Sequence, residues 1–187
     1  MTSDLQASEI LALYEDAVKQ TRGFVAAVRP EQLRLATPCT EWNVQKLLDH
    51  IVELPGFYAG ILTGRRPTLI APGSGSLETF DSATTTLIQT SKQPGVLARK
   101  FSSPQGSMSG AQFLLSAFLD MLIHGWDLAY ATGQDTDLDP DLVDAAYELF
   151  APHMEGLRPS GAFGVEVPVA PNAGRQDRLL AIMGRQA

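Results

Sequence analysis

The stretch from Ser109 to Thr132 constrains the fold more than any other part of the chain, because it is almost continuously apolar. At 3.6 residues per turn, its Leu, Phe, Met, Ile and Trp side chains point to all sides of a helix rather than along one stripe. A helix that is apolar on every side is buried by neighbouring elements. The stretch therefore predicts the central helix of an all-α bundle, and Gly133 predicts its end.

The other apolar residues mostly recur at helical spacing, which indicates further helices joined by Pro- and Gly-rich connections. A helix is expected over 8–28, ended by Pro30, and another from the N-cap Asn43 to Gly64, with a kink or break at Pro55. The remaining expected elements are a Thr-rich helix over 77–92, a short extended piece over 96–101 with a turn after it, a helix starting at Asp139-Pro140, a loop or short strand over 161–171, and a closing helix in RQDRLLAIMGR. The segment RRPTLIAPGSGS is expected to be an exposed loop.

These elements predict an all-α four-helix bundle with extra short helices and an irregular C-terminal tail, in one domain spanning residues 1–187. The net charge of −7 and the scattered Lys and Arg residues argue against a nucleic-acid partner, which needs a clustered positive face. No apolar stretch has the roughly 18 residues of a membrane span, and the N-terminus lacks the order of a secretory signal. A cytoplasmic protein that binds no membrane is expected.

Two carboxylates and an imidazole interrupt the central helix. Because an α-helix turns about 100° per residue, Asp120, His124 and Asp127 share one face, which is the core-facing one. A bare carboxylate in the interior costs several kcal/mol, more than the roughly 1 kcal/mol that one hydrogen bond returns. Asp120 therefore needs compensation, either from an ion pair with His124 or from a divalent metal bound by both.

A histidine on another helix favours the metal. His50 interrupts the apolar stripe of the second helix, so two of the three histidines in the chain are expected to face inward from different helices. This pattern predicts a metal site formed by His50, Asp120 and His124. The alternatives are that each buried histidine bonds a carbonyl or hydroxyl group, or that the two helices never meet.

Two other residues, Asp127 and His153, carry side chains of the types that bind metals. Asp127 is expected to accept a hydrogen bond from the N–H of a metal-binding imidazole rather than to bind the metal itself, the alternative being a helix cap or salt bridge. His153, after Pro152 near a helix end, is expected to be a surface residue without a role.

Three segments carry a resemblance to a known family: ATPCTEWNVQKLLDHIV, DMLIHGWDLAYATGQ and RQDRLLAIMGR. The sequence resembles the DinB-like (DinB/YfiT-like) metal-binding proteins of the mycothiol-dependent maleylpyruvate isomerase type, as a small single-domain actinobacterial-type member. The pairing of W-x-x-x-x-L-x-x-H with D-x-x-x-H-x-W-D-L is fairly specific. The resemblance implies a four-helix bundle that holds a divalent metal, commonly zinc, with His50, Asp120 and His124 as ligands.

The resemblance to the isomerase itself is partial. The isomerase has a glutamate where Asp120 stands, and it is expected to carry a further C-terminal domain for which this chain has no room. The resemblance therefore implies the metal scaffold, but it does not by itself imply the isomerisation of maleylpyruvate.

The expected ligand set also indicates a chemistry. Two neutral imidazoles and one carboxylate leave a Zn²⁺ site with a net charge of about +1 and an open position, which a thiolate would neutralise. A metal lowers the pKa of a bound thiol and so yields a nucleophile at neutral pH. Mycothiol or another low-molecular-weight thiol is expected as the cosubstrate, in keeping with the resemblance.

Cys39 is not expected to supply this thiol. It precedes the second helix, whereas His50 lies about two turns inside it. As the single cysteine of the chain it cannot form an internal disulfide, which agrees with a reducing compartment, and a small buried hydrophobic residue is expected.

The leading expectation is a metal-dependent thiol S-transferase or isomerase that acts on a small electrophile. A non-catalytic bundle that binds a metal or small ligand is the alternative, and a non-haem Fe(II) enzyme ranks third. Zinc is the expected metal, with nickel or iron as alternatives. Arg65 and Arg66 bind an anionic substrate or form a solvated loop pair, the latter being favoured, and a homodimer through an exposed apolar bundle face is an open alternative.

Overall fold

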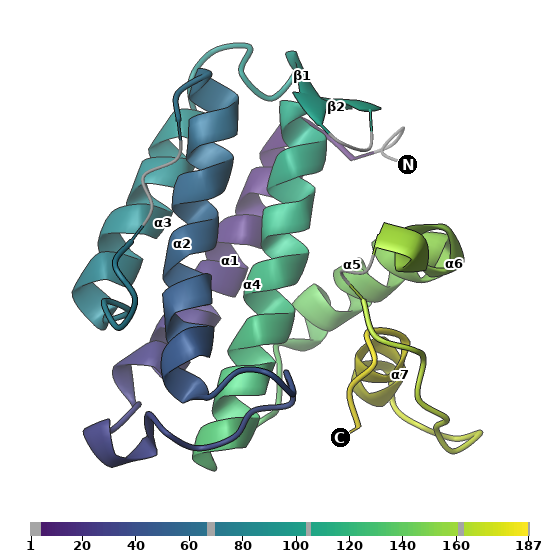
Figure 1. Ribbon diagram of the computed structural model, residues 1–187. Coiled ribbons are helices and arrows are strands. Elements are labelled where there is room, and N and C mark those ends of the chain that lie inside the picture. Colours follow the sequence, from purple (N-terminus) through teal and green to yellow (C-terminus); the bar gives the residue numbers. More distant parts are fainter. Residues whose placement is uncertain (1–4, 67–69, 104–105, 161–162, 187) are drawn as a thin grey trace. The chain divides into compact units, whose positions relative to one another are not determined.

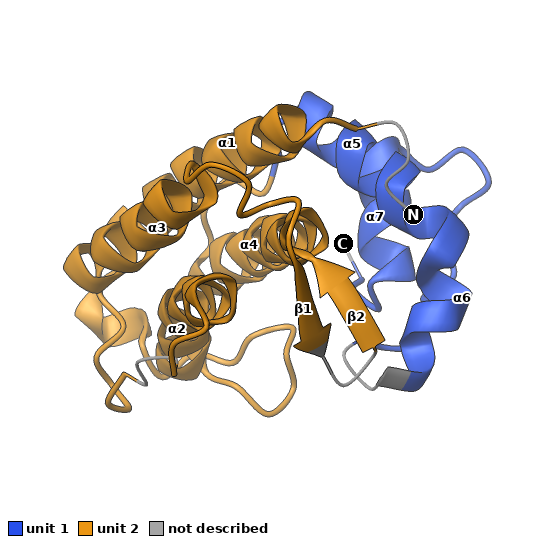
Figure 2. Cartoon of the chain, turned by 90° about the horizontal axis from the view of Figure 1, so that it is seen from above, with its two compact units in different colours: residues 1, 137–187 blue, residues 2–136 orange. Residues whose placement is uncertain are grey.

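The computed structural model describes residues 5–66, 70–103, 106–160 and 163–186. The chain forms two compact units, one of residues 2–136 and one of residues 137–187 together with residue 1 (Figure 2). The larger unit contains the residues of the expected metal site. The expectation of a single domain over residues 1–187 stays a prediction.

Four long helices form the larger unit (Figure 1), which confirms the expected all-α bundle. They are α1 (Ala7–Ala26), α2 (Val44–Thr63), α3 (Leu77–Ser91) and α4 (Gly110–Thr132). Helix α4 packs against α1 and α2, and α3 packs against α1 and α2. A 3₁₀ helix, η1 (Pro30–Gln32), and a hairpin of antiparallel strands β1 (Lys100–Ser103) and β2 (Gly106–Ser109) complete the unit.

Helix α4 is the buried helix that its sequence predicts. Most of its residues are buried, on every side of the helix. Its N-terminus has a capping box, in which the Ser109 hydroxyl accepts from the backbone N–H of Gln112 and the Gln112 side chain accepts from that of Ser109. At the other end Gly133 takes the left-handed conformation, with φ 68°, and closes the helix.

Helices α1 and α4 approach closely where α4 has a glycine. A methyl group at Gly125 would overlap the Thr21 hydroxyl of α1 and would lie 3.3 Å from Cβ of Thr21. The same hydroxyl donates to the backbone carbonyl of Met121 at 3.0 Å. The glycine thus sets the spacing of these two helices, and with it the position of the neighbouring His124.

Helix α2 begins and ends as predicted. Asn43 caps it by accepting from the backbone N–H of Lys46 at 3.0 Å, and Gly64 closes it with φ 68°. The helix is one continuous element through Pro55, where a kink or break was expected. A proline ring removes one N–H of the helix ladder, and packing of the buried Pro55 within the bundle tolerates that loss.

The extended piece lies further along the chain than expected. Strand β1 starts at Lys100, whereas Val96 and Leu97 are buried in turns. The carbonyls of Leu97 and Arg99 accept from the first N–H groups of α4, namely those of Ala111 and Gly110. Residues 96–99 thus accept hydrogen bonds from the first N–H groups of α4 instead of forming a strand.

The smaller unit consists of short helices, as expected for this part of the chain. Its elements are α5 (Pro140–Phe150), η2 (Ala151–His153), α6 (Met154–Leu157), η3 (Arg158–Ser160) and α7 (Arg175–Ile182). Asp139 caps α5, and Arg175 of α7 forms ion pairs with Asp144 at 3.1 Å and Glu148 at 3.0 Å. Residues 163–174 contain no helix or strand, and the first two residues of the expected tail over 161–171 lie outside the described residues.

No helix in the described part of the chain is both long and apolar enough to cross a lipid bilayer.

Candidate metal centre

The two histidines of interest meet between α2 and α4, which run antiparallel side by side (Figure 1). The ring centroids of His50 and His124 are 4.8 Å apart, and the ring planes are nearly perpendicular at 87°. Both side chains are half-buried. The alternative in which the two helices never meet at these residues is therefore wrong.

Trp42 covers this pair of imidazoles. Its ring centroid lies 4.5 Å from that of His50 and 5.7 Å from that of His124. The residue stands in the connection just before α2, and it is the tryptophan of the W-x-x-x-x-L-x-x-H pattern. The sequence reasoning gave Trp42 no role in the site, although its spacing to His50 carried the signal.

Asp127 lies beside His124 on the same helix. Its Oδ2 is 3.0 Å from Nδ1 of His124, and its side chain is fully buried. When Nδ1 carries the proton and donates to this carboxylate, the lone pair of the neutral ring is on Nε2. This contact orients the ring in the way that outer carboxylates orient metal-binding histidines. That Asp127 supports a metal-binding His124 in this way stays a prediction.

Cys39 also reaches this pair, against expectation. Its thiol donates to Oδ2 of Asp127 at 3.3 Å, and its Sγ lies 3.9 Å from Nδ1 of His124. The sequence places Cys39 before α2 and therefore far from His50 along that helix. The connection before α2 instead lies beside the C-terminal half of the antiparallel α4, so Cys39 contacts α4. Cys39 is half-buried rather than buried.

Backbone hydrogen bonds fix the connection that carries Cys39. A bridge pairs Ala36 with Asn43, and the N–H of Trp42 donates to the carbonyl of Cys39 at 2.8 Å. The Thr37 hydroxyl accepts from the N–H of Cys39 at 3.2 Å. These bonds close a tight loop over the start of α2, and Cys39 stands within it.

Cys39, His124 and Asp127 form a cluster that could hold a metal ion. One ligand atom from each, namely a thiol sulfur, an imidazole nitrogen and a carboxylate oxygen, lies within 4.8 Å of the other two. Such nitrogen, sulfur and oxygen donors suit a divalent transition metal. The structure thus contains a donor cluster that the sequence did not reveal.

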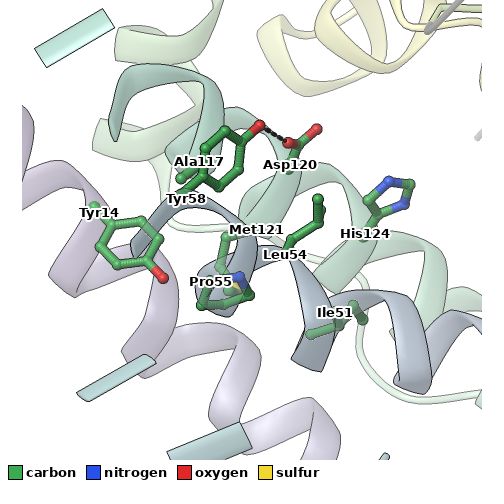
Figure 3. A pocket seen from close by; sticks show the side chains of 9 residues that line it. All are labelled: Tyr14, Ile51, Leu54, Pro55, Tyr58, Ala117, Asp120, Met121 and His124. Carbon is green, nitrogen blue, oxygen red and sulfur yellow. Dashed lines mark hydrogen bonds between the residues drawn. The ribbon is translucent and has the colours of Figure 1, made fainter. Parts of the chain in front are cut away.

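Asp120 has a partner on α2. The Tyr58 hydroxyl donates to Oδ2 of Asp120 at 2.7 Å (Figure 3). The pKa of Tyr58 lies well above its ordinary value, mainly because the hydroxyl is buried and secondly because the carboxylate of Asp120 is close by. This hydroxyl therefore keeps its proton. Tyr58 is one of the buried residues of α2, and its spacing in the sequence gives no sign of this partner. The ligand set of His50, Asp120 and His124 stays a prediction.

A small cavity adjoins Asp120. It has a volume of about 10 Å³, close to the smallest that holds one water molecule, and Tyr14, Tyr58, Asp120 and His124 are among its lining residues (Figure 3). The Tyr14 hydroxyl is fully buried and has no hydrogen-bond partner among the described residues. The pKa of Tyr14 is raised mainly by burial and secondly by the charge of Asp120, so this hydroxyl also stays protonated. A polar group bound in this cavity could form a hydrogen bond with the Tyr14 hydroxyl.

His50 is poised to act as a neutral imidazole. The pKa of His50 is lowered to about 3, mainly by burial and secondly by the neighbouring His124. At neutral pH the ring therefore offers a lone pair, which metal coordination requires. The donors available here, two imidazoles and two carboxylates with a thiol beside them, fit a divalent metal.

Three further polar residues are not part of this cluster of side chains. His153 is exposed, as expected, in the smaller unit. Arg65 and Arg66 are exposed at the far end of α2, where they line a groove together with Arg99. Arg65 and Arg66 are absent from the lining of the cavity at Asp120.

Three comparisons with known proteins bear on this centre. The model of a family described as the mycothiol maleylpyruvate isomerase N-terminal domain matches residues 14–129. Two uncharacterized proteins of Mycobacterium tuberculosis, from strains CDC 1551 and H37Rv, are each 33% identical over 184 residues, covering 94% of this chain and 97% of their own. A crystal structure of the mycothiol-dependent maleylpyruvate isomerase superposes with a TM-score of 0.69 at 14% identity.

The superposition corrects one expectation. It covers 97% of this chain and 90% of the isomerase chain. The isomerase therefore has no large C-terminal domain without a counterpart here.

Proposed function

Since the chain belongs to the mycothiol maleylpyruvate isomerase N-terminal domain family, we propose that it is a divalent-metal-dependent thiol S-transferase or isomerase. The thiol is a low-molecular-weight one of the mycothiol class, and the second substrate is a small electrophile. The pair of imidazoles from α2 and α4, 4.8 Å apart, is the observation that carries the proposal.

His50, Asp120 and His124 are the proposed ligands, with zinc as the proposed metal. When bound, such an ion supplies a positive centre that favours the thiolate form of a thiol at neutral pH. Two neutral imidazoles and one carboxylate leave about one positive charge there, which suits a single thiolate.

Surrounding side chains support these ligands. His50 is neutral because of its burial, and it offers its lone pair without first losing a proton. Asp127 holds Nδ1 of His124 at 3.0 Å, and the lone pair of that ring is then on Nε2. The Tyr58 hydroxyl donates to Oδ2 of Asp120 and so holds this carboxylate on the cavity that His124 also lines. Trp42 packs over both imidazoles and limits the access of water.

The second candidate is a metal-binding protein without catalysis. Cys39 favours it, because a thiol of the chain itself lies 3.9 Å from Nδ1 of His124 and could bind the metal as its thiolate ligand. In that case the thiolate comes from the protein, and no external thiol is required.

Turnover separates the two candidates. Metal-loaded protein is assayed with mycothiol, or a surrogate thiol, and a panel of small electrophiles. The proposal expects turnover that a chelator abolishes, that added Zn²⁺ restores, and that a Cys39→Ser variant retains. Absence of turnover across a broad panel, from protein that holds about one ion per chain, would support the non-catalytic candidate.

The ligand set is tested separately from the reaction. In a Cys39→Ser background, replacing His50 by Ala should remove the bound metal, whereas replacing the exposed His153 by Ala should leave it. Full retention of the metal after the His50 replacement would contradict the proposed set.

A further inference from the structure

We propose that Cys39, His124 and Asp127 form a second position for a divalent metal ion, with Cys39 as a thiolate ligand. This position shares His124 with the set proposed above and uses neither His50 nor Asp120. Metal binding at this position can therefore be tested separately from the ligand set and the reaction of the proposed function.

The distances between the three donor atoms are close to those of a tetrahedral site. Around one zinc-sized ion, with metal–sulfur and metal–nitrogen or oxygen distances of about 2.3 and 2.1 Å, ligand atoms lie about 3.4–3.6 Å apart. The observed separations are 3.9 Å from Sγ of Cys39 to Nδ1 of His124, 3.3 Å from Sγ to Oδ2 of Asp127, and 3.0 Å from Nδ1 to that oxygen. Adjustments of a few tenths of an ångström bring all three onto one ion.

The three donors are held in place before any ion binds. Asp127 is fully buried and His124 is largely buried on the well-packed α4, with side-chain exposures of 0% and 13%. Cys39 stands on the loop that the Ala36–Asn43 bridge and the bond from Trp42 N–H close. Little conformational freedom remains to be lost on binding, which favours affinity.

The donor types select the kind of ion. One sulfur, one nitrogen and one carboxylate oxygen favour zinc or cobalt over magnesium or calcium, which prefer oxygen ligands. Three protein ligands also leave a fourth position of a tetrahedral ion for water or another ligand.

The two positions exclude each other. A neutral imidazole has one lone pair, so His124 ligates either through Nδ1, toward Cys39 and Asp127, or through Nε2. With Nε2 as the ligand, Nδ1 carries the proton and donates to Asp127. The geometry thus predicts one ion per chain, with the tautomer of His124 deciding which position is filled.

Cobalt substitution tests this inference, because thiolate coordination gives Co²⁺ an intense near-ultraviolet charge-transfer band. Cys39 is the single cysteine of the chain, so in thiol-free buffer any such band comes from it. Reduced, metal-free protein is titrated with Co²⁺ as wild type and as the Cys39→Ser, His50→Ala, Asp127→Asn and His124→Ala variants, with circular dichroism to verify that each is folded.

The expected result is a band at one Co²⁺ per chain in His50→Ala, its absence in Cys39→Ser, and its loss in His124→Ala. Because losing an outer partner of a ligand already costs roughly 10–100-fold in affinity, adding Cys39→Ser to His50→Ala should weaken Co²⁺ binding at least about 10-fold. The band should weaken in Asp127→Asn.

Folded wild type and His50→Ala that bind Co²⁺ without the band would overturn the inference and leave the proposed function intact. A Cys39→Ser variant that binds no Co²⁺, beside a wild type that shows the band, would support the inference and contradict the ligand set of the proposed function. Failure of both proteins to bind Co²⁺ at all would overturn both.

Discussion

Tyr58 of α2 and Asp120 of α4 are joined by a 2.7 Å hydrogen bond from the phenol to the carboxylate. The bond links the two helices that carry the imidazole pair, one turn of α4 away from His124. It also helps to explain how an apolar helix tolerates the half-buried Asp120, because a hydrogen bond to a charged group offsets part of the free-energy cost of its desolvation.

Replacing Tyr58 by Phe should therefore destabilise the metal-free protein. Loss of a hydrogen bond to a charged group costs about 1.5–3 kcal/mol, and the partial exposure of Asp120 favours the lower end. Urea unfolding measures the change, with Tyr130→Phe at an exposed position of α4 as the control, expected to stay within about 0.5 kcal/mol. Equal stabilities of the two variants would show that the bond contributes nothing.

Asp127→Asn should weaken metal binding by roughly 10–100-fold, the usual cost of losing a carboxylate that orients a ligating histidine. The amide keeps the shape of the side chain but lacks the charge that fixes the proton on Nδ1 of His124. Competition with a chromophoric chelator measures the affinity. An exposed carboxylate at Asp16 of α1 provides the matched control, since Asp16→Asn changes the net charge equally and should leave the affinity unchanged.

Gly125→Ala should lower the free energy of unfolding by about 1–3 kcal/mol, because the added methyl group overlaps the Thr21 hydroxyl and forces α1 and α4 apart. Gly23 of α1 is the control, because a methyl group there meets nothing within 4 Å, and Gly23→Ala should stabilise the protein by up to about 1 kcal/mol. Chemical denaturation at one temperature gives both values. A Gly125→Ala protein as stable as wild type would mean that the helices adjust without cost.

The neutral state of His50 predicts a pH dependence of stability. Its pKa falls from 6.5 to about 3 on folding, so between these values the unfolded chain binds a proton that the folded chain does not. Metal-free wild type should lose stability as the pH falls below 6.5 toward 3, and His50→Gln should lose less. Urea midpoints over this range measure the difference. His153→Gln, at an exposed position, should follow wild type, and identical slopes for wild type and His50→Gln would contradict the burial of a neutral ring.

The helices were predictable because their signals are local. Apolar spacing placed α1, α2 and α4 to within two residues at each end, and Asn43, Gly64 and Gly133 mark boundaries through their caps. The strand at Lys100 was displaced from its expected place, because residues 96–99 serve the start of α4, a tertiary requirement that spacing does not express.

The candidate site was predictable only in part. His50 and His124 each interrupt an apolar stripe, and this local signal was enough to expect them to face inward. Tyr58 looks like one more core residue of its stripe, and Cys39 stands in a loop whose path depends on the bridge between Ala36 and Asn43. Partners that arise from the antiparallel packing of α2 and α4 need the fold itself.

The most direct test of the central claim, that this bundle holds a divalent metal through His124, is the metal content of the purified protein. Elemental analysis should find about one ion per chain in wild type and in His153→Ala, and none in folded His124→Ala, because both proposed positions use that ring. Wild type that takes up no stoichiometric ion from a metal-supplemented buffer, or His124→Ala that keeps one, would contradict the account.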